Sequence, residues 1–203
     1  ARARMLMLGR QSASAKVARM PERTNDDDLA ERLSRHGLRI TRQRVATLRV
    51  LEQMAAPLEH LLRNAVAHGI EPPAERAAAG KPESGSIELA VSQEGNEIAI
   101  AIADDGAGLD LERIAVRARE RGLIGADEHP DERRLTNLIF VSGFSTASEL
   151  SAVSGRGVGM DVVKAQTAAA GGRVDVASRR GEGTRFNLRL PLTLAVTQAL
   201  LVQ

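Results

Sequence analysis

The sequence contains no cysteine, tryptophan or tyrosine, and phenylalanine occurs only at Phe140, Phe144 and Phe186. The lack of cysteine excludes disulfides, thiolate nucleophiles and cysteine-ligated metals. The scarcity of aromatic side chains argues against the stacking surfaces with which proteins bind single-stranded nucleic acid. No apolar run reaches the roughly 18 residues of a membrane-spanning helix, and the first residues lack the pattern of a secretory signal. We therefore expect a cytoplasmic protein.

Charge is nearly balanced, with a formal net charge of +2, but it is unevenly distributed. Residues 1–50 carry 12 basic and 5 acidic side chains, whereas residues 51–203 carry 16 and 21. A basic segment thus precedes a mildly acidic body. Such a segment is able to contact DNA weakly, but the sequence predicts no specific nucleic-acid partner.

Hydrophobic periodicity and turn residues divide the chain into three parts: a helical or irregular segment at 1–55, a body at 56–192, and a short apolar end at 193–203. Residues 1–25, 70–85 and 123–153 show little periodicity, and we interpret them as irregular. In the body, two alternating hairpins accompany three helices. The order predicts an α+β fold, a two-layer sandwich with helices on one face of a mixed or antiparallel sheet. The predicted helices are 26–36, 41–55, 58–68, 110–121 and 160–170, and the predicted strands are 86–92, 97–103, 173–178 and 184–190.

Three polar side chains recur at helical spacing in the helix predicted at 58–68. His60, Asn64 and His68 stand at i, i+4 and i+8, which places them on one helix face. An amide oxygen such as that of Asn64 is a hard ligand suited to Mg²⁺. A solvated polar face explains the same spacing, so the pattern alone does not decide between the two.

An Asp-Asp-Gly-Ala-Gly motif follows the strand at 97–103. A buried carboxylate at Asp104 is able to accept a hydrogen bond from an exocyclic amine, which would select adenine over guanine. Gly106 and Gly108 would let the backbone approach a ligand closely. An ordinary Asp-Gly turn is the alternative.

Two further elements point to phosphate. Gly155, Gly157 and Gly159 directly precede a helix, where free amides and the positive helix end bind anions. The spacing is neither that of a P-loop nor that of a dinucleotide fold. Arg113 and Arg117 lie one turn apart and would clamp phosphates, although such pairs are more often solvated.

Taken together, these motifs resemble those of the GHKL ATPase superfamily, and within it the ATP-binding domain of chemotaxis histidine kinases of the CheA type. The segments that carry the resemblance are 57–71, 104–110, 140–146, 154–164 and 181–186. The resemblance covers about residues 56–192. It implies a two-layer GHKL sandwich that binds ATP and Mg²⁺.

The resemblance also implies roles for single residues. Asn64 would hold Mg²⁺, Asp104 would bind the adenine amine with support from Thr184, and His60 would lie near the γ-phosphate. Gly106 and Gly108 would admit the adenine and ribose, and the three glycines at 155, 157 and 159 would surround the phosphates. Positions near the phosphates or the metal are implied for Arg63, His68, Arg113 and Arg117.

Three features depart from this family. Ala67 stands where its members usually carry an acidic residue. Residues 28–48 resemble instead the first helices of a ferric-uptake-regulator winged helix, without its metal ligands. Residues 193–203 correspond only to the start of a coupling domain, so a CheW-like adaptor and chemoreceptors are expected partners only if that domain is complete.

The sequence therefore predicts a protein-histidine kinase core that transfers the γ-phosphate of ATP to a histidine on a separate phosphotransfer domain, with a response regulator downstream. A dimer is expected only through segments that this sequence does not contain. The alternative is a catalytically inactive nucleotide-binding remnant, or a fusion with a non-functional winged-helix-like N-terminus. A winged-helix DNA-binding protein ranks below both. ATP hydrolysis of the gyrase or chaperone kind also ranks below phosphotransfer, because Glu59 lies one position off the helix face of His60 and Asn64.

Overall fold

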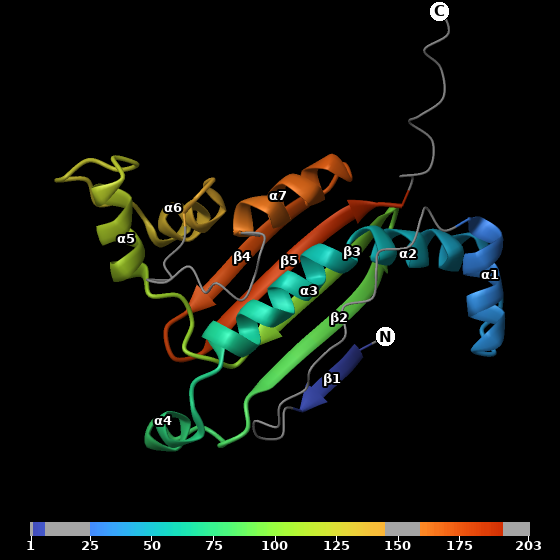
Figure 1. The fold of residues 1–203 in the computed structure, drawn as a ribbon, viewed down its shortest axis with the longest axis horizontal. Helices are drawn as coiled ribbons and strands as arrows, with labels where there is room; N and C mark the ends of the chain where they lie inside the picture. Colours follow the sequence, from blue (N-terminus) through green and yellow to red (C-terminus); the bar gives the residue numbers. More distant parts are fainter. Residues whose placement is uncertain (1, 7–24, 145–158, 193–203) are drawn as a thin grey trace, which may run out of the picture.

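The computed structural model describes residues 2–6, 25–144 and 159–192 (Figure 1). Their strands form one five-stranded sheet in the order β1-β2-β3-β5-β4, and every pairing is antiparallel. The predicted α+β sandwich is confirmed, with a described sheet that is antiparallel throughout rather than mixed. The strands are β1 (Arg2–Leu6), β2 (Ser86–Glu94), β3 (Glu97–Asp104), β4 (Arg173–Arg179) and β5 (Gly183–Pro191).

The helices lie mainly over one face of this sheet, with α3 and α7 crossing it and α2 continuing beyond its end (Figure 1). Among the described residues, no helix combines the length and the apolar composition that crossing a membrane requires. The helices are α1 (Asp26–Arg35), α2 (Arg42–Gln53), α3 (Ala55–Asn64), η1 (Ala65–Gly69), α4 (Pro73–Ala78), α5 (Leu111–Glu120), α6 (Glu132–Asn137), η2 (Leu138–Phe140) and α7 (Met160–Ala169).

The core forms between the helices and the inner face of the sheet. Strand β3 alternates strictly, so that Ile98, Ile100 and Ile102 are at most 1% exposed while the alanines between them face the other side. Leu61 from α3 and Val163 from α7 are buried against this face. Burying each such side chain contributes about 1.5–3 kcal/mol, which fixes the register of β3 and therefore the position of its last residue, Asp104.

Both predicted hairpins are present, each within two residues of its expected bounds. Glu94 pairs with Glu97 across a two-residue turn in which Gly95 has a φ of +61°. Arg179 pairs with Gly183 across the second turn. The second hairpin therefore brings Thr184 next to the end of β3.

The first residues that the structure describes form a strand, where the sequence predicted irregular chain. Residues 2–6, which we interpreted as irregular, form β1 and pair with β2 at one edge of the sheet. An edge strand joins the sheet through backbone hydrogen bonds, so the sequence pattern of its side chains is a weak predictor of the strand. The predicted helices α1 and α2 are confirmed, and Leu29 of α1, fully buried, packs in this helical pair.

Two short helices were not predicted. α4 lies within the Pro- and Ala-rich connection at 70–85, and α6 lies in the weakly periodic stretch at 123–153. Each has six residues, fewer than two turns, so neither displays a full period of apolar positions.

Candidate functional site

Asp104 ends β3 at the centre of the candidate site. Its Oδ1 accepts hydrogen bonds from the backbone N–H of Gly106 at 3.0 Å and of Thr184 at 3.2 Å. No described residue donates to its Oδ2, which is left for an external donor. Burial raises the pKa of the Asp104 carboxyl, the two backbone bonds oppose this, and the nearby charges of Asp105 and Glu71 raise it further.

Glycines surround this carboxylate because no side chain fits there. A Cβ on Gly106 would lie 2.0 Å from the carbonyl oxygen of Gly69, and one on Gly183 would lie 2.0 Å from that of Asp104. Gly183 also has a φ of +106°, which L-residues rarely adopt. Gly108 lies against the main chain of Arg179. The two motif glycines at 106 and 108 therefore permit close backbone contacts within the protein, a tighter requirement than approach of a ligand alone.

Thr184 is buried beside Asp104, as expected of a supporting residue. Its N–H reaches the carboxylate, and its hydroxyl lies 3.1 Å from that of Ser178 on β4. The Ser178 hydroxyl also accepts from the N–H of Leu109, just after the glycine motif. Strands β4 and β5 thus brace the turn that carries Asp104.

Sequence reasoning missed a cluster of ion pairs on the other side of that turn. Arg76, which has no exposed surface, bonds Glu71 and Asp105, both at 3.0 Å. Lys81 bonds Glu71 at 2.7 Å. The bonded partners are 5 to 29 positions apart in the sequence and follow no helix or strand period, so only the tertiary fold brings them together.

Asn64 and His60 lie side by side on α3, as predicted. The amide nitrogen of Asn64 lies 3.1 Å from Nε2 of His60 and 3.5 Å from the sulfur of Met160 on α7. Burial, and then the charge of Arg63, lowers the pKa of His60 despite the opposing charge of Asp161, which favours a neutral ring that accepts through Nε2. Two acceptors therefore orient the Asn64 amide, and its oxygen receives no bond from a described residue.

His68 does not keep the helical register predicted for it. The chain changes from α-helix to a π-helical turn at Ala65–Gly69, so that the i+8 position no longer follows the α-helical period. His68 is exposed there, whereas His60 and Asn64 are half-buried.

The predicted arginines lie on exposed or partly exposed helix surfaces. Arg63 bonds Glu59 at 2.5 Å, and Arg113 is exposed on α5. The buried Nε of Arg117 has no hydrogen-bond partner among the described residues. Within the described residues, likewise, no hydrogen bond or ion pair links His68, Arg113 or Arg117 to Asp104 or Asn64.

Gly155 and Gly157 lie outside the described residues, and Gly159 caps α7 in an extended conformation with a φ of −100°. Two residues later, the Asp161 carboxylate accepts from the Ser142 hydroxyl at 3.0 Å and from the N–H of Val162 at 2.9 Å. Of the predicted phosphate glycines, Gly159 alone is described, and it lies at a helix N-terminus as expected.

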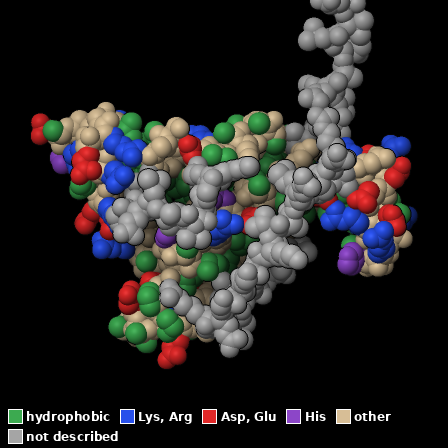
Figure 2. Space-filling view, in the orientation of Figure 1, with side chains coloured by type: hydrophobic (Ala, Val, Ile, Leu, Met, Phe, Trp, Pro, Cys, Tyr) green, Lys and Arg blue, Asp and Glu red, His purple; other side chains and the backbone are tan. Residues whose placement is uncertain are grey.

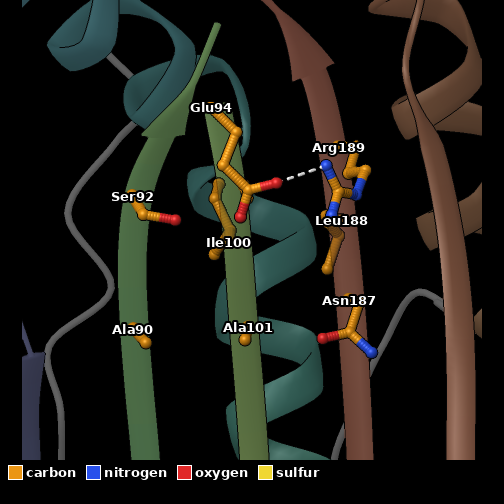
Figure 3. A pocket seen from close by; sticks show the side chains of 9 residues that line it. Ala90, Ser92, Glu94, Ile100, Ala101, Asn187, Leu188 and Arg189 are labelled. Atoms are coloured by element: carbon orange, nitrogen blue, oxygen red, sulfur yellow. Dashed lines mark hydrogen bonds and ion pairs between the residues drawn. The ribbon is translucent and has the colours of Figure 1, made fainter. Parts of the chain in front are cut away.

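Neither of two described cavities coincides with Asp104 or Asn64. One, of about 450 Å³, lies between η2 and α7 and is lined by Phe140, Asp161 and Lys164 among others. The other, of about 140 Å³, is a shallow hollow over Ala101, Asn187 and Arg189 on the sheet face turned away from α3 (Figure 3). The arrangement of donors and acceptors at Asp104 defines the candidate site better than cavity volume does.

A family model described as histidine kinase-, DNA gyrase B- and HSP90-like ATPase matches residues 53–194. The chain belongs to this ATPase family. The match includes Asn64, Asp104 and Thr184 and begins after α1 and nearly all of α2.

Curated relatives within this ATPase family confirm the CheA-type resemblance. The chain is 46% identical over 153 residues to the chemotaxis protein CheA of Rhizobium meliloti, covering 75% of this chain and 20% of that protein. It is 45% identical over 156 residues to CheA of Bacillus subtilis, covering 76% and 23%. It is 48% identical over 155 residues to the sensor histidine kinase CheAY of Helicobacter pylori, covering 75% and 19%. The chain thus spans only about a fifth of each relative.

Proposed function

We propose that this chain is the ATP-binding catalytic core of a chemotaxis-type sensor histidine kinase. The observation that carries the proposal is the carboxylate of Asp104, anchored through Oδ1 and open to a donor at Oδ2. Adenine presents an amine at the position where guanine presents a carbonyl oxygen. A carboxylate oxygen accepts from the first and repels the second, so the site favours ATP over GTP.

The donor set also fits Mg²⁺ carried mainly by nucleotide phosphates. The described residues contain no group of three or more His, Cys, Asp or Glu side chains able to hold a metal. Asn64 offers one amide oxygen, and the contacts of its amide nitrogen with His60 and Met160 fix the orientation of that amide. Mg²⁺ commonly takes one or two protein oxygens, phosphates and water, and when bound it neutralises phosphate charge and orients the phosphates.

Transfer of the phosphoryl group needs positioning more than covalent help from the protein. A nitrogen of the acceptor histidine attacks the γ-phosphorus, a P–N bond forms, and the bond to the bridging oxygen breaks to release ADP. The attacking nitrogen is the unprotonated one of the neutral ring, so the ring becomes cationic, and the proton on its other nitrogen then leaves to solvent. We assign His60 to orienting Asn64, because its neutral Nε2 already accepts from that amide.

The proposal has further consequences for partners and location. It requires a phosphotransfer domain that supplies the histidine, and it implies a response regulator downstream and a cytoplasmic location. A CheW-like adaptor and receptors would act through a coupling domain that follows this core.

Calorimetric titration with ATP, with and without Mg²⁺, tests the proposal, and GTP is the control. We expect ATP to bind in the micromolar to sub-millimolar range and GTP to bind far more weakly. Labelled ATP and an added phosphotransfer domain from a CheA relative then test transfer. ATP binding without transfer would favour an inactive nucleotide-binding remnant. The sequence feature that agrees with this alternative is Ala67, which stands where the family usually carries an acidic residue. A folded chain that binds neither nucleotide would refute both.

A further inference from the structure

In the turn after Asp104, the backbone N–H and carbonyl groups of residues 105–107 all have hydrogen-bond partners. The N–H of Asp105 donates to the carbonyl of Ser86 at 3.2 Å, and the N–H of Ala107 donates to that of Gly69 at 2.8 Å. The carbonyl of Ala107 accepts from the N–H of Gly181 at 2.7 Å. Only the carbonyls of Asp105 and Gly106 point away from other backbone, and both are met by cations.

Lys81 supplies the first cation. Its Nζ donates to the carbonyl of Gly106 at 2.8 Å, to the carbonyl of Asp105 at 3.0 Å and to the Glu71 carboxylate at 2.7 Å. All three donors of the ammonium group are used. A neutral side chain of similar length could not satisfy the three acceptors together.

Arg76 supplies the second cation, and its side chain is completely buried. Its guanidinium donates to the Asp105 carboxylate at 3.0 Å, to the Asp105 carbonyl at 3.2 Å, to Glu71 at 3.0 Å and to the carbonyl of Pro82 at 2.7 Å. The Asp105 carboxylate in turn accepts from the N–H of Ser86 at 2.9 Å. A buried charge with four acceptors is costly to disturb, because any lost bond leaves a polar group unpaired.

We propose that Arg76 and Lys81 are positioning residues for adenine recognition, holding the 104–107 turn so that Oδ2 of Asp104 faces the adenine amine. The inference rests on the proposed function, since it concerns how that base is bound. Neither cation bonds Asp104 directly. Each acts through Asp105 or Gly106, the two residues that follow it.

The same pair of cations also sets the charge around Asp104. Asp105 and Glu71 both raise the pKa of the Asp104 carboxyl, and Arg76 and Lys81 neutralise them through ion pairs. The remaining neighbours are uncharged N–H groups of Gly106 and Thr184, and Gly69, which follows the exposed His68. Removing one cation therefore extends protonation of Asp104 to higher pH.

Lys81→Gln is the main test, with Lys81→Arg and Arg76→Lys as charge-retaining variants. Binding of ADP and of inosine diphosphate, which lacks the amine, is measured at pH 6 and pH 8 on variants shown to be folded by circular dichroism. We expect Lys81→Gln to weaken ADP binding about tenfold at pH 8, and any difference between the two pH values to be a larger loss at pH 6. The affinity for inosine diphosphate should fall less, so the preference for ADP over inosine diphosphate decreases. Lys81→Arg should restore part of this preference. A merely destabilising change would leave the selectivity of the folded protein intact.

Arg173→Gln is the matched control, because it removes an exposed ion pair with Glu97 at the opposite end of β3. It should change neither affinity nor selectivity. Parental selectivity in folded Lys81→Gln and Arg76→Lys at both pH values would overturn the inference while the proposed function stands.

If the parent itself does not bind ADP, the proposed function and the adenine role both fail. We call Arg76 and Lys81, with the acceptors that they bond, the clamp. Carboxyl NMR titration of Asp104 then tests the effect of the clamp on this carboxylate without nucleotide. The clamp predicts a higher titration midpoint in Lys81→Gln than in the parent, and an unchanged midpoint would overturn it as well.

Discussion

Replacing Asp104 by Asn changes one hydrogen-bond acceptor of the candidate site into a donor, with almost no change in the shape of the side chain. Oδ1 is retained and still accepts from the N–H groups of Gly106 and Thr184. The atom in place of Oδ2 becomes an NH₂ donor, which would face the donating amine of adenine. Losing a bond to a charged acceptor costs about 1.5–3 kcal/mol, and the unpaired donor adds about 1–3 kcal/mol. We therefore expect ATP affinity to fall by about 100-fold or more.

The same substitution should not weaken the fold. Burial raises the folded pKa of Asp104 above its usual 3.8, so ionising this group opposes folding. That cost is fully present above the folded pKa and disappears as the pH falls toward 3.8. Asn never carries it, so the melting temperature of Asp104→Asn at pH 7 should equal or exceed that of the parent. This difference should shrink as the pH falls.

Calorimetric titration with ATP and thermal melts at pH 7 and pH 4 measure both effects. Asp175→Asn is the control, because this carboxylate lies exposed on β4, and it should leave ATP affinity unchanged. Parental ATP affinity in folded Asp104→Asn would refute the assignment of Oδ2 to adenine. A large loss of stability at pH 7 would refute the account of its pKa.

Three further changes test the glycine contacts, the metal ligand and the N-terminal helices. Gly183→Ala should cost about 3 kcal/mol or more of unfolding free energy, because strain adds to a clash with the Asp104 carbonyl. Gly181→Ala, at a φ of +80° in open space, should cost only about 1–2 kcal/mol, and equal costs in denaturant titrations would contradict the clash. Asn64→Leu should remove the Mg²⁺-dependent part of ATP affinity, at least about tenfold, so that adding EDTA changes parental binding but not that of the variant. Leu29→Ala should destabilise the α1–α2 pair by about 2–5 kcal/mol in thermal melts, and an unchanged melting profile would mean that these helices unfold separately.

Local pattern was sufficient where the functional residues follow the period of one element. His60 and Asn64 are four apart on a regular helix, and Asp104 is the last residue of a strand in which buried and less buried side chains alternate. His68 shows the limit of this argument, because a π-helical turn breaks the period between Asn64 and Gly69. A change of helix type depends on contacts made after folding, such as the one between Gly69 and the Asp104 turn.

The clamp at Arg76 and Lys81 could not be predicted by the same means. Its members come from the short helix α4 and the irregular segments around it, and they meet a turn more than 20 residues away. Surface charge gave no guide either, because basic and acidic side chains are interspersed on the described parts of the face in Figure 2. Only burial distinguishes Arg76 from the other arginines of the chain that the structure describes.

The scarcity of aromatic residues makes the Asp104 contact more important than it would be in an aromatic-rich site. All three phenylalanines are buried, at 5 to 8% exposure, and none is free to stack on a base. Phe140 packs edge-on against Phe186 with ring centroids 6.5 Å apart, while Arg121 lies over Phe144. Stacking, which tolerates every base alike, is therefore not available from these rings. Base selection falls to hydrogen-bond polarity at Oδ2, which is why a single exchange of acceptor for donor should decide between adenine and its 6-oxo analogues.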